Sequence, residues 1–184
     1  MDNSNPEIKK TVSLGFIWVL GIAAFLVTAD MRAISPILPA VADYFHVREA
    51  TAGFLVTAYS IPYGLFQLFY GPLAERIGKI QTIVIAVTMY GLGTIVSGFV
   101  SSFQGLLILR FINGMFAAGI IPIAMAYIGD SVDFSARQTA LGQFFSMSTS
   151  GQVMGMVIGG VITQFVGWQA LFIVLGVAAM PAAF

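Results

Sequence analysis

Two ionisable residues, Asp30 and Arg110, lie inside long apolar stretches of the sequence. A charged side chain at the centre of a membrane-spanning helix costs about 2.5–3.5 kcal/mol on insertion scales, so each of these residues needs a partner or a wet cavity. A carboxylate and a guanidinium can neutralise each other, and protonating the carboxylate, or displacing it with a cationic ligand, would release the arginine. The two residues therefore predict a switch that couples proton movement to a second event.

The positions of these two residues predict that they lie at similar depth. Asp30 is roughly 9 Å inside the outer end of its helix when counted back from Pro36, and Arg110 is roughly 10 Å inside the same face when counted from Phe103. Two structural alternatives remain open. The two residues could form a static ion pair, or Asp30 could pair with neighbouring Arg32 at the membrane interface.

Three further polar side chains follow one another within the second apolar stretch: Tyr59, Tyr63 and Gln67. A glutamine that faced lipid would leave its amide group without hydrogen bonds, so this stretch is expected to turn these side chains inward. They could line a substrate cavity, and hydrogen bonds between packed helices would explain them equally well.

The elements that hold these residues are predicted to be transmembrane helices. Hydrophobic residues make up 58% of the 184 residues and charged residues only 9%, whereas an ordinary soluble domain is roughly a quarter charged. A helix needs about 20 apolar residues to cross a bilayer. Runs of that kind predict a single all-α bundle, residues 1–184, with six spans at approximately 11–35, 50–70, 80–100, 103–127, 140–166 and 168–184. The last run ends at Phe184 without a polar exit, which predicts truncation within or at the end of helix six.

The basic residues predict the orientation of this bundle. Five fall on one side of the predicted membrane, namely Lys9, Lys10, Arg76, Lys79 and Arg137. Two fall on the other side, namely Arg32 and Arg48. Cytoplasmic loops carry the excess of lysine and arginine. The sequence therefore predicts a multi-pass protein of the plasma (inner) membrane with a cytoplasmic N-terminus.

Several classes of function are not expected. The chain has no cysteine and a single histidine, His46, so a metal centre and a redox site are not predicted. It has no phosphate-binding P-loop and no nucleophile beside a recognisable base. The protein is therefore not expected to be an enzyme, and neither catalytic residues nor a cofactor are predicted. The formal net charge is zero and no basic run is present, which argues against a nucleic-acid partner.

The segment between the second and third stretches resembles a known family signature. It reads Gly-Pro-Leu-Ala-Glu-Arg-Ile-Gly-Lys, and its marker residues are Gly71, Glu75, Arg76, Gly78 and Lys79. This is similar to the signature loop of the major facilitator superfamily, G-x-L-A-D-R-x-G-R-K, with glutamate in place of aspartate and Ile80 at the second basic position. The resemblance implies a tight turn that latches the outward-open state.

Two further motifs strengthen the resemblance to this superfamily. In the fourth stretch, Arg110 is followed by Asn113 and Gly114, which is similar to a family motif whose arginine is associated with proton coupling, with asparagine in place of the commoner glutamine. The fifth stretch carries a glycine motif similar to that of the family's exporters, with Met156 at the proline position. Its glycines are Gly151, Gly155, Gly159 and Gly160.

The resemblance implies the N-terminal half of a drug:proton antiporter. Such a half would carry small apolar or cationic molecules outward in exchange for protons, and a C-terminal six-helix half, or a second copy of the chain, would complete the pathway in the bilayer. Asp30 matches the acidic position that multidrug exporters use. A proton symporter for metabolite uptake and, from another class, a non-transporting scaffold or fragment are the alternatives.

Overall fold

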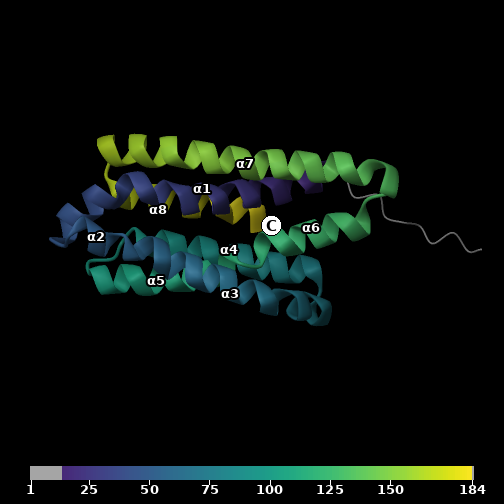
Figure 1. The fold of residues 1–184 in the computed structure, drawn as a ribbon. Coiled ribbons are helices and arrows are strands. Elements are labelled where there is room, and N and C mark those ends of the chain that lie inside the picture. Colours follow the sequence, from purple (N-terminus) through teal and green to yellow (C-terminus); the bar gives the residue numbers. More distant parts are fainter. Residues whose placement is uncertain (1–13, 184) are drawn as a thin grey trace, which may run out of the picture.

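The computed structural model describes residues 14–183, which form long helices packed side by side (Figure 1). In chain order the helices are α1 Leu14–Phe45, α2 Glu49–Ala52, α3 Phe54–Ile77, α4 Lys79–Ser97, α5 Phe103–Ala117, α6 Ile120–Ser131, α7 Phe134–Phe165, α8 Trp168–Ala179 and the 3-10 turn η1 Met180–Ala183. Within this part of the chain no strand occurs. The short α2 leads directly into α3, and α5 leads into α6, so six helical segments build the bundle.

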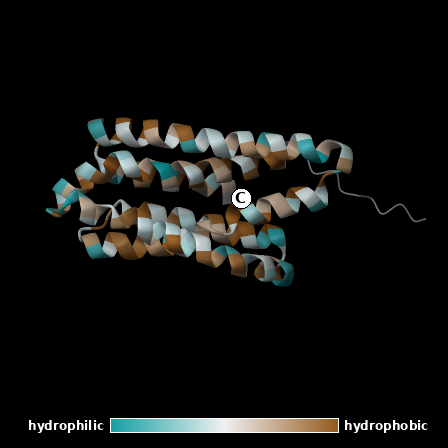
Figure 2. Cartoon of the chain, viewed as in Figure 1, coloured by the Kyte–Doolittle hydropathy of each residue, from teal (hydrophilic) through white to brown (hydrophobic). Residues whose placement is uncertain are grey.

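Five of these segments are long and apolar enough to cross a membrane. They are Gly15–Phe45, Glu49–Ile77, Lys79–Ser97, Phe103–Ser131 and Phe134–Phe165, and a shorter apolar segment covers Trp168–Ala182. Hydrophobic residues occur along the length of these segments, and hydrophilic residues gather toward the turns at both ends of the bundle (Figure 2). The predicted fold class, an all-α membrane protein with one six-helix bundle, is confirmed.

The predicted end of the first helix, at residue 35, is wrong. Helix α1 continues through Pro36 and Pro39 to Phe45, which places Asp30 near its middle. A proline removes one backbone hydrogen bond and crowds the preceding turn, but helices in membrane proteins tolerate it where packed neighbours compensate. Ile37 and Val41 are fully buried on this extension, so packing holds it in the helical form.

The predicted turn between the second and third helices is much shorter in the structure. Helix α3 includes the signature segment as far as Ile77, and the chain reverses at Gly78 alone, where φ is 95°. Such a φ suits glycine because a Cβ would clash with the backbone. The turn between the fourth and fifth predicted helices is shorter in the same way, since α6 ends at Ser131 and α7 begins at Phe134.

Helices α1 and α7 pack in parallel along most of their length (Figure 1). Gly155 and Gly159 of α7 face Ala29 and Ala33 of α1, and a Cβ on Gly159 would lie 2.8 Å from the Ala33 carbonyl oxygen. Small residues let helix backbones approach this closely in membranes. Helix α5 packs against α3 and α4, and α4 packs against α8. These contacts bring α1 and α5 to a common interior.

Candidate functional site: a buried ion pair and its polar surroundings

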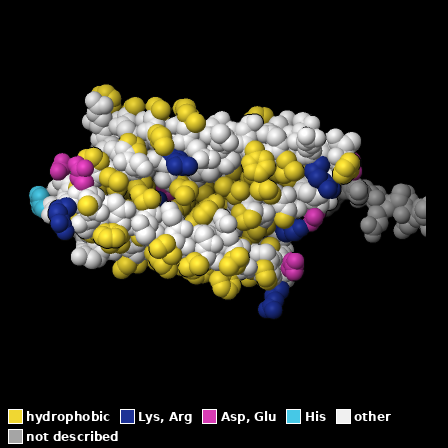
Figure 3. All heavy atoms as spheres, viewed as in Figure 1, with side chains coloured by type: hydrophobic (Ala, Val, Ile, Leu, Met, Phe, Trp, Pro, Cys, Tyr) yellow, Lys and Arg dark blue, Asp and Glu magenta, His cyan; other side chains and the backbone are white. Residues whose placement is uncertain are grey.

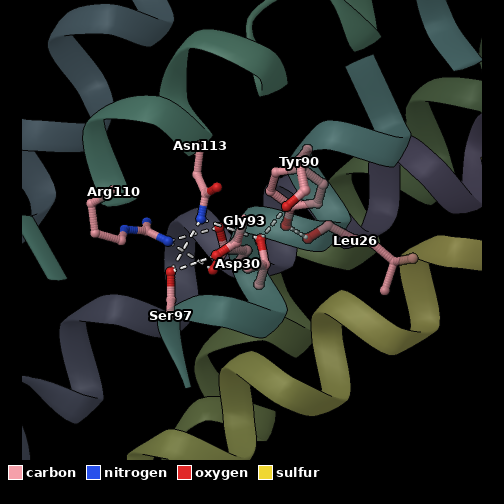
Figure 4. Close-up of polar contacts among 8 residues, drawn as sticks. Leu26, Asp30, Tyr90, Gly93, Ser97, Arg110 and Asn113 are labelled. Atoms are coloured by element: carbon pink, nitrogen blue, oxygen red, sulfur yellow. Dashed lines mark hydrogen bonds and ion pairs between the residues drawn. The ribbon is translucent and has the colours of Figure 1, made fainter. Parts of the chain in front are cut away.

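Asp30 and Arg110 form an ion pair inside the bundle. Nη1 of Arg110 lies 2.9 Å from Oδ1 and 2.8 Å from Oδ2 of Asp30, and both side chains are 1% exposed (Figure 4). Helix α1 supplies the carboxylate and α5 the guanidinium. The sequence-based prediction that the two lie at a common depth therefore agrees with this geometry, although the depth counted from Pro36 was too small.

The surroundings of the pair exclude water. Ala29, Ala33 and Ile34, which flank Asp30 on α1, are each no more than 1% exposed. Two charges in such a place are poorly solvated, so each depends on the other, and removing one partner from a buried pair typically costs about 3–5 kcal/mol. The alternative pairing with Arg32 is not seen, because Arg32 is exposed and points to α7.

An aromatic side chain covers the guanidinium. Cζ of Arg110 lies 4.2 Å from the centre of the Tyr59 ring and 5.7 Å from that of Phe172. Tyr59 in turn stacks on Tyr63, with ring centres 6.0 Å apart and planes 15° from parallel. A cation over an aromatic face gains about 2 kcal/mol where both are desolvated. Of the three polar residues singled out on this helix, Tyr59 is buried against the pair, Tyr63 is half-buried and Gln67 is exposed.

A polar cluster lies one helical turn beyond Arg110. Nδ2 of Asn113 is 3.4 Å from Oγ1 of Thr94 and 3.4 Å from Oγ of Ser97 (Figure 4). Gly93 leaves room for the asparagine, because a Cβ there would meet Oδ1 of Asn113. Thr94 and Ser97 were not predicted as site residues, since a hydroxyl in an apolar helix gives no sign of which helix it faces.

Three buried polar atoms in this region have no hydrogen-bond partner among the described residues: Oη of Tyr59, Nε of Arg110 and Oδ1 of Asn113. Buried polar groups are normally paired, and an unpaired one costs about 1–3 kcal/mol. The region thus holds donors and acceptors beyond those that the ion pair uses.

The neighbouring Gly114 has a packing role. A Cβ at this position would meet the carbonyl oxygen of Tyr59 and would lie 2.9 Å from Cγ of Pro62. Helix α5 can therefore approach α3 closely, and this contact sets the position of the Tyr59 ring over Arg110.

The signature segment lies at one end of the bundle. Glu75 and Arg76 are exposed at the end of α3, and Gly71 has open space around it. Lys79, after the turn at Gly78, forms an ion pair with Asp130 at the end of α6. No feature of the sequence pairs Asp130 with this segment, because 51 positions separate it from Lys79.

The glycine motif of α7 serves mainly to pack α1. Cβ atoms on Gly151, Gly155 or Gly159 would collide with the α1 backbone, whereas one on Gly160 would be 4.0 Å from Cβ of Pro36. Three of the four glycines are therefore required by close approach. Met156, at the position of the motif's proline, is exposed on an α7 helix that runs without a break from Phe134 to Phe165.

Arg32 on α1 is an exposed basic residue beside α7. Nη2 of Arg32 donates a hydrogen bond to Oε1 of Gln152 on α7, 3.2 Å away, and the contact is exposed. The early helix end assumed at residue 35 placed Arg32 at the membrane interface, and the long α1 now places it within the helix. Gln152 was not predicted as a site residue.

Comparisons with known proteins agree on one family. The family model described as Major Facilitator Superfamily matches residues 20–184. The uncharacterized MFS-type transporter YceJ of Bacillus subtilis (strain 168) is 29% identical over 164 residues, which are 89% of this chain and 42% of that protein. The lincomycin resistance protein of Streptomyces lincolnensis is 28% identical over 173 residues, which are 94% of this chain and 35% of that protein.

Solved structures show the same fold. A bacterial homolog of the human lysosomal transporter Spinster, in an inward-facing and occupied conformation, matches with a TM-score of 0.80 at 21% identity. The match covers 91% of this chain and 42% of that one. The chain thus spans less than half the length of the relatives it matches.

Proposed function

Because this chain belongs to the major facilitator superfamily, we propose that it forms one half of a proton-coupled exporter whose coupling element is the Asp30–Arg110 pair. The observation that carries the proposal is a carboxylate and a guanidinium, each 1% exposed, that bind each other across two helices of an apolar bundle. Such residues inside membrane proteins commonly serve proton relays and ion pathways.

The proposed coupling step is a single proton transfer. A proton that binds a carboxylate oxygen of Asp30 removes the negative charge, and the ion pair to Arg110 is lost. The guanidinium stays charged because arginine does not deprotonate in proteins. It then depends on Tyr59 and on the polar atoms near Asn113, so protonated and deprotonated states favour different arrangements of α1 and α5. Export of a substrate would use that difference.

The direction of transport is proposed from two features. The glycine motif of α7 resembles that of exporters, and the lincomycin resistance protein is a relative whose name records drug resistance. Between apolar and cationic substrates, the geometry favours those with a large apolar part, because Asp30 is buried and engaged by Arg110 and offers no open carboxylate to a cation.

A second six-helix bundle is needed to complete this exporter. Helices α3 and α7 are the least buried of the long helices, and they expose large apolar side chains such as Leu65, Leu68, Val157 and Val161. A C-terminal half, or a second copy of the chain, would cover part of this surface, and lipid would cover the remainder. Membrane location and a cytoplasmic N-terminus belong to the same proposal. The described residues put Arg76, Lys79 and Arg137 at one end; Lys9 and Lys10 lie outside them.

The test is proton-driven transport in lipid vesicles, by this chain alone and as part of any longer protein that contains it. Vesicles would be equilibrated with the neutral probe N-phenyl-1-naphthylamine, with tetraphenylphosphonium or with 2-naphthoate at equal concentration on both sides, and a proton gradient would then be imposed. Wild type is expected to move at least one probe against its gradient, and Asp30→Asn is expected to lose this while still exchanging the probe across the membrane. Asp43→Asn, at the exposed end of α1, is the matched control and should behave as wild type. Unchanged gradient-driven transport in Asp30→Asn would contradict the proposal.

A further inference from the structure

Arg32 and Gln152 lie far from the ends of their helices. Arg32 is 13 positions before Phe45, the last residue of α1, and Gln152 is 13 positions before Phe165, the last residue of α7. At 1.5 Å per residue each distance is about 20 Å. An arginine side chain reaches only a few ångströms along a helix, so it does not span that distance to the helix end.

The surface between this pair of residues and the C-terminal end of α7 is largely apolar. Beyond Gln152, α7 exposes Val153, Met156, Val157 and Val161. Figure 3 shows charged side chains gathered near the two ends of the visible face, and a basic side chain also midway along it. A cation among apolar side chains at this depth is not stable against lipid, and such residues almost always face a water-filled cavity or the protein interior. The face of α1 and α7 that carries Arg32 is therefore expected to line a water-filled cavity or the protein interior and not to face lipid.

The charge of Arg32 is not neutralised within the described part of the chain. Its hydrogen bond goes to a neutral amide, and no described carboxylate lies within ion-pair distance of it. Asp30, two positions away, is buried and engaged by Arg110. Asp43 and Glu49 lie at one end of the bundle, and Glu75 and Asp130 at the other. This face of α1 and α7 thus presents a net positive charge.

We propose that Arg32 and Gln152 form a subsite for the anionic group of the substrate, so that the cargo class is an amphipathic organic anion such as an aromatic carboxylate. This inference rests on the proposed transport function and names its substrate. The guanidinium has donors besides the one held by Gln152, and it binds carboxylates through a planar fork. The exposed Met156, one turn from Gln152, offers the apolar part of such a molecule a soft and adaptable contact.

The absence of cysteine from the sequence permits a direct test. Gln152→Cys would be introduced into the full chain in lipid vesicles and treated with anionic methanethiosulfonate ethylsulfonate or cationic methanethiosulfonate ethyltrimethylammonium. Each reaction rate is divided by the rate of the same reagent with a free thiol, and we expect the ratio of the anionic to the cationic value to exceed one. This ratio should fall about tenfold on adding Arg32→Gln, and it should stay high with Arg32→Lys. Phe165→Cys is the matched control, because it is exposed about 20 Å away, beyond the screening length at physiological salt.

Protection then tests the substrate class. With Arg32 present, 2-naphthoate should slow modification of Gln152→Cys, and its neutral amide, 2-naphthamide, should not. Three results would overturn the inference: no reaction with either reagent, a charge preference that does not depend on Arg32, or equal protection by the amide. Thiol modification needs no proton gradient and no transport, so failure here is distinct from failure of the proton-coupling proposal.

Discussion

The cost of breaking the Asp30–Arg110 pair can be estimated from its burial. Asp30→Asn leaves the Arg110 guanidinium, 1% exposed, without its counter-ion. Losing one partner of a buried pair costs about 3–5 kcal/mol. For a chain of this size, 1 kcal/mol shifts the unfolding midpoint by roughly 2–4 °C, so we expect Asp30→Asn to lower it by about 6–20 °C.

The opposite change tests the other partner of the pair. Arg110→Gln leaves the Asp30 carboxylate, 1% exposed, without its counter-ion, so it should also lose about 3–5 kcal/mol of stability. Thermal unfolding in detergent, followed by the fluorescence of Trp18 and Trp168, measures both.

The double variant Asp30→Asn with Arg110→Gln decides whether the two residues are coupled. It removes both charges, so it should be more stable than Asp30→Asn alone and far more stable than the sum of the single losses implies. If its loss equals that sum, the two side chains do not interact energetically and the reasoning from the ion pair is refuted.

Two further predictions use matched residues. Gly155→Ala should lose about 1–3 kcal/mol of stability in the same unfolding assay, because its Cβ would collide with the α1 backbone, while Gly160→Ala should unfold as wild type does; equal behaviour of the two would contradict the packing account. Lys79→Gln should lose less than about 1 kcal/mol, because the Lys79 and Asp130 side chains are 28% and 66% exposed, and a loss comparable to that of Asp30→Asn would show that this end pair is more than a surface contact.

The general architecture was predictable because apolar run length is a direct consequence of bilayer thickness. The ends of the helices were less predictable, as the continuation of α1 through Pro36 shows. A proline ends a helix only when no packing compensates for the lost hydrogen bond, and the packing of Ile37 and Val41 depends on helices that are distant in sequence. The same limitation hid the helical form of the signature segment up to Ile77.

The candidate site was predictable only in part. Asp30 and Arg110 stand out in apolar runs, and a charge there needs a partner, so their pairing follows from residue type. Arg32 was misplaced because its depth was counted from Pro36. Asp130, Thr94 and Gln152 were missed because helices that are apolar on nearly every face give no signal of which residues meet across them.

The most direct test of proton coupling reverses the transport assay. Full-chain protein in lipid vesicles would be given an outward gradient of whichever probe it carries, and internal pH would be followed together with probe movement. Wild type is predicted to move protons inward as the probe leaves, and Asp30→Asn to move the probe with no change in internal pH. Proton movement in Asp30→Asn at the wild-type ratio to probe would contradict the account, because the coupling proton would then bind elsewhere.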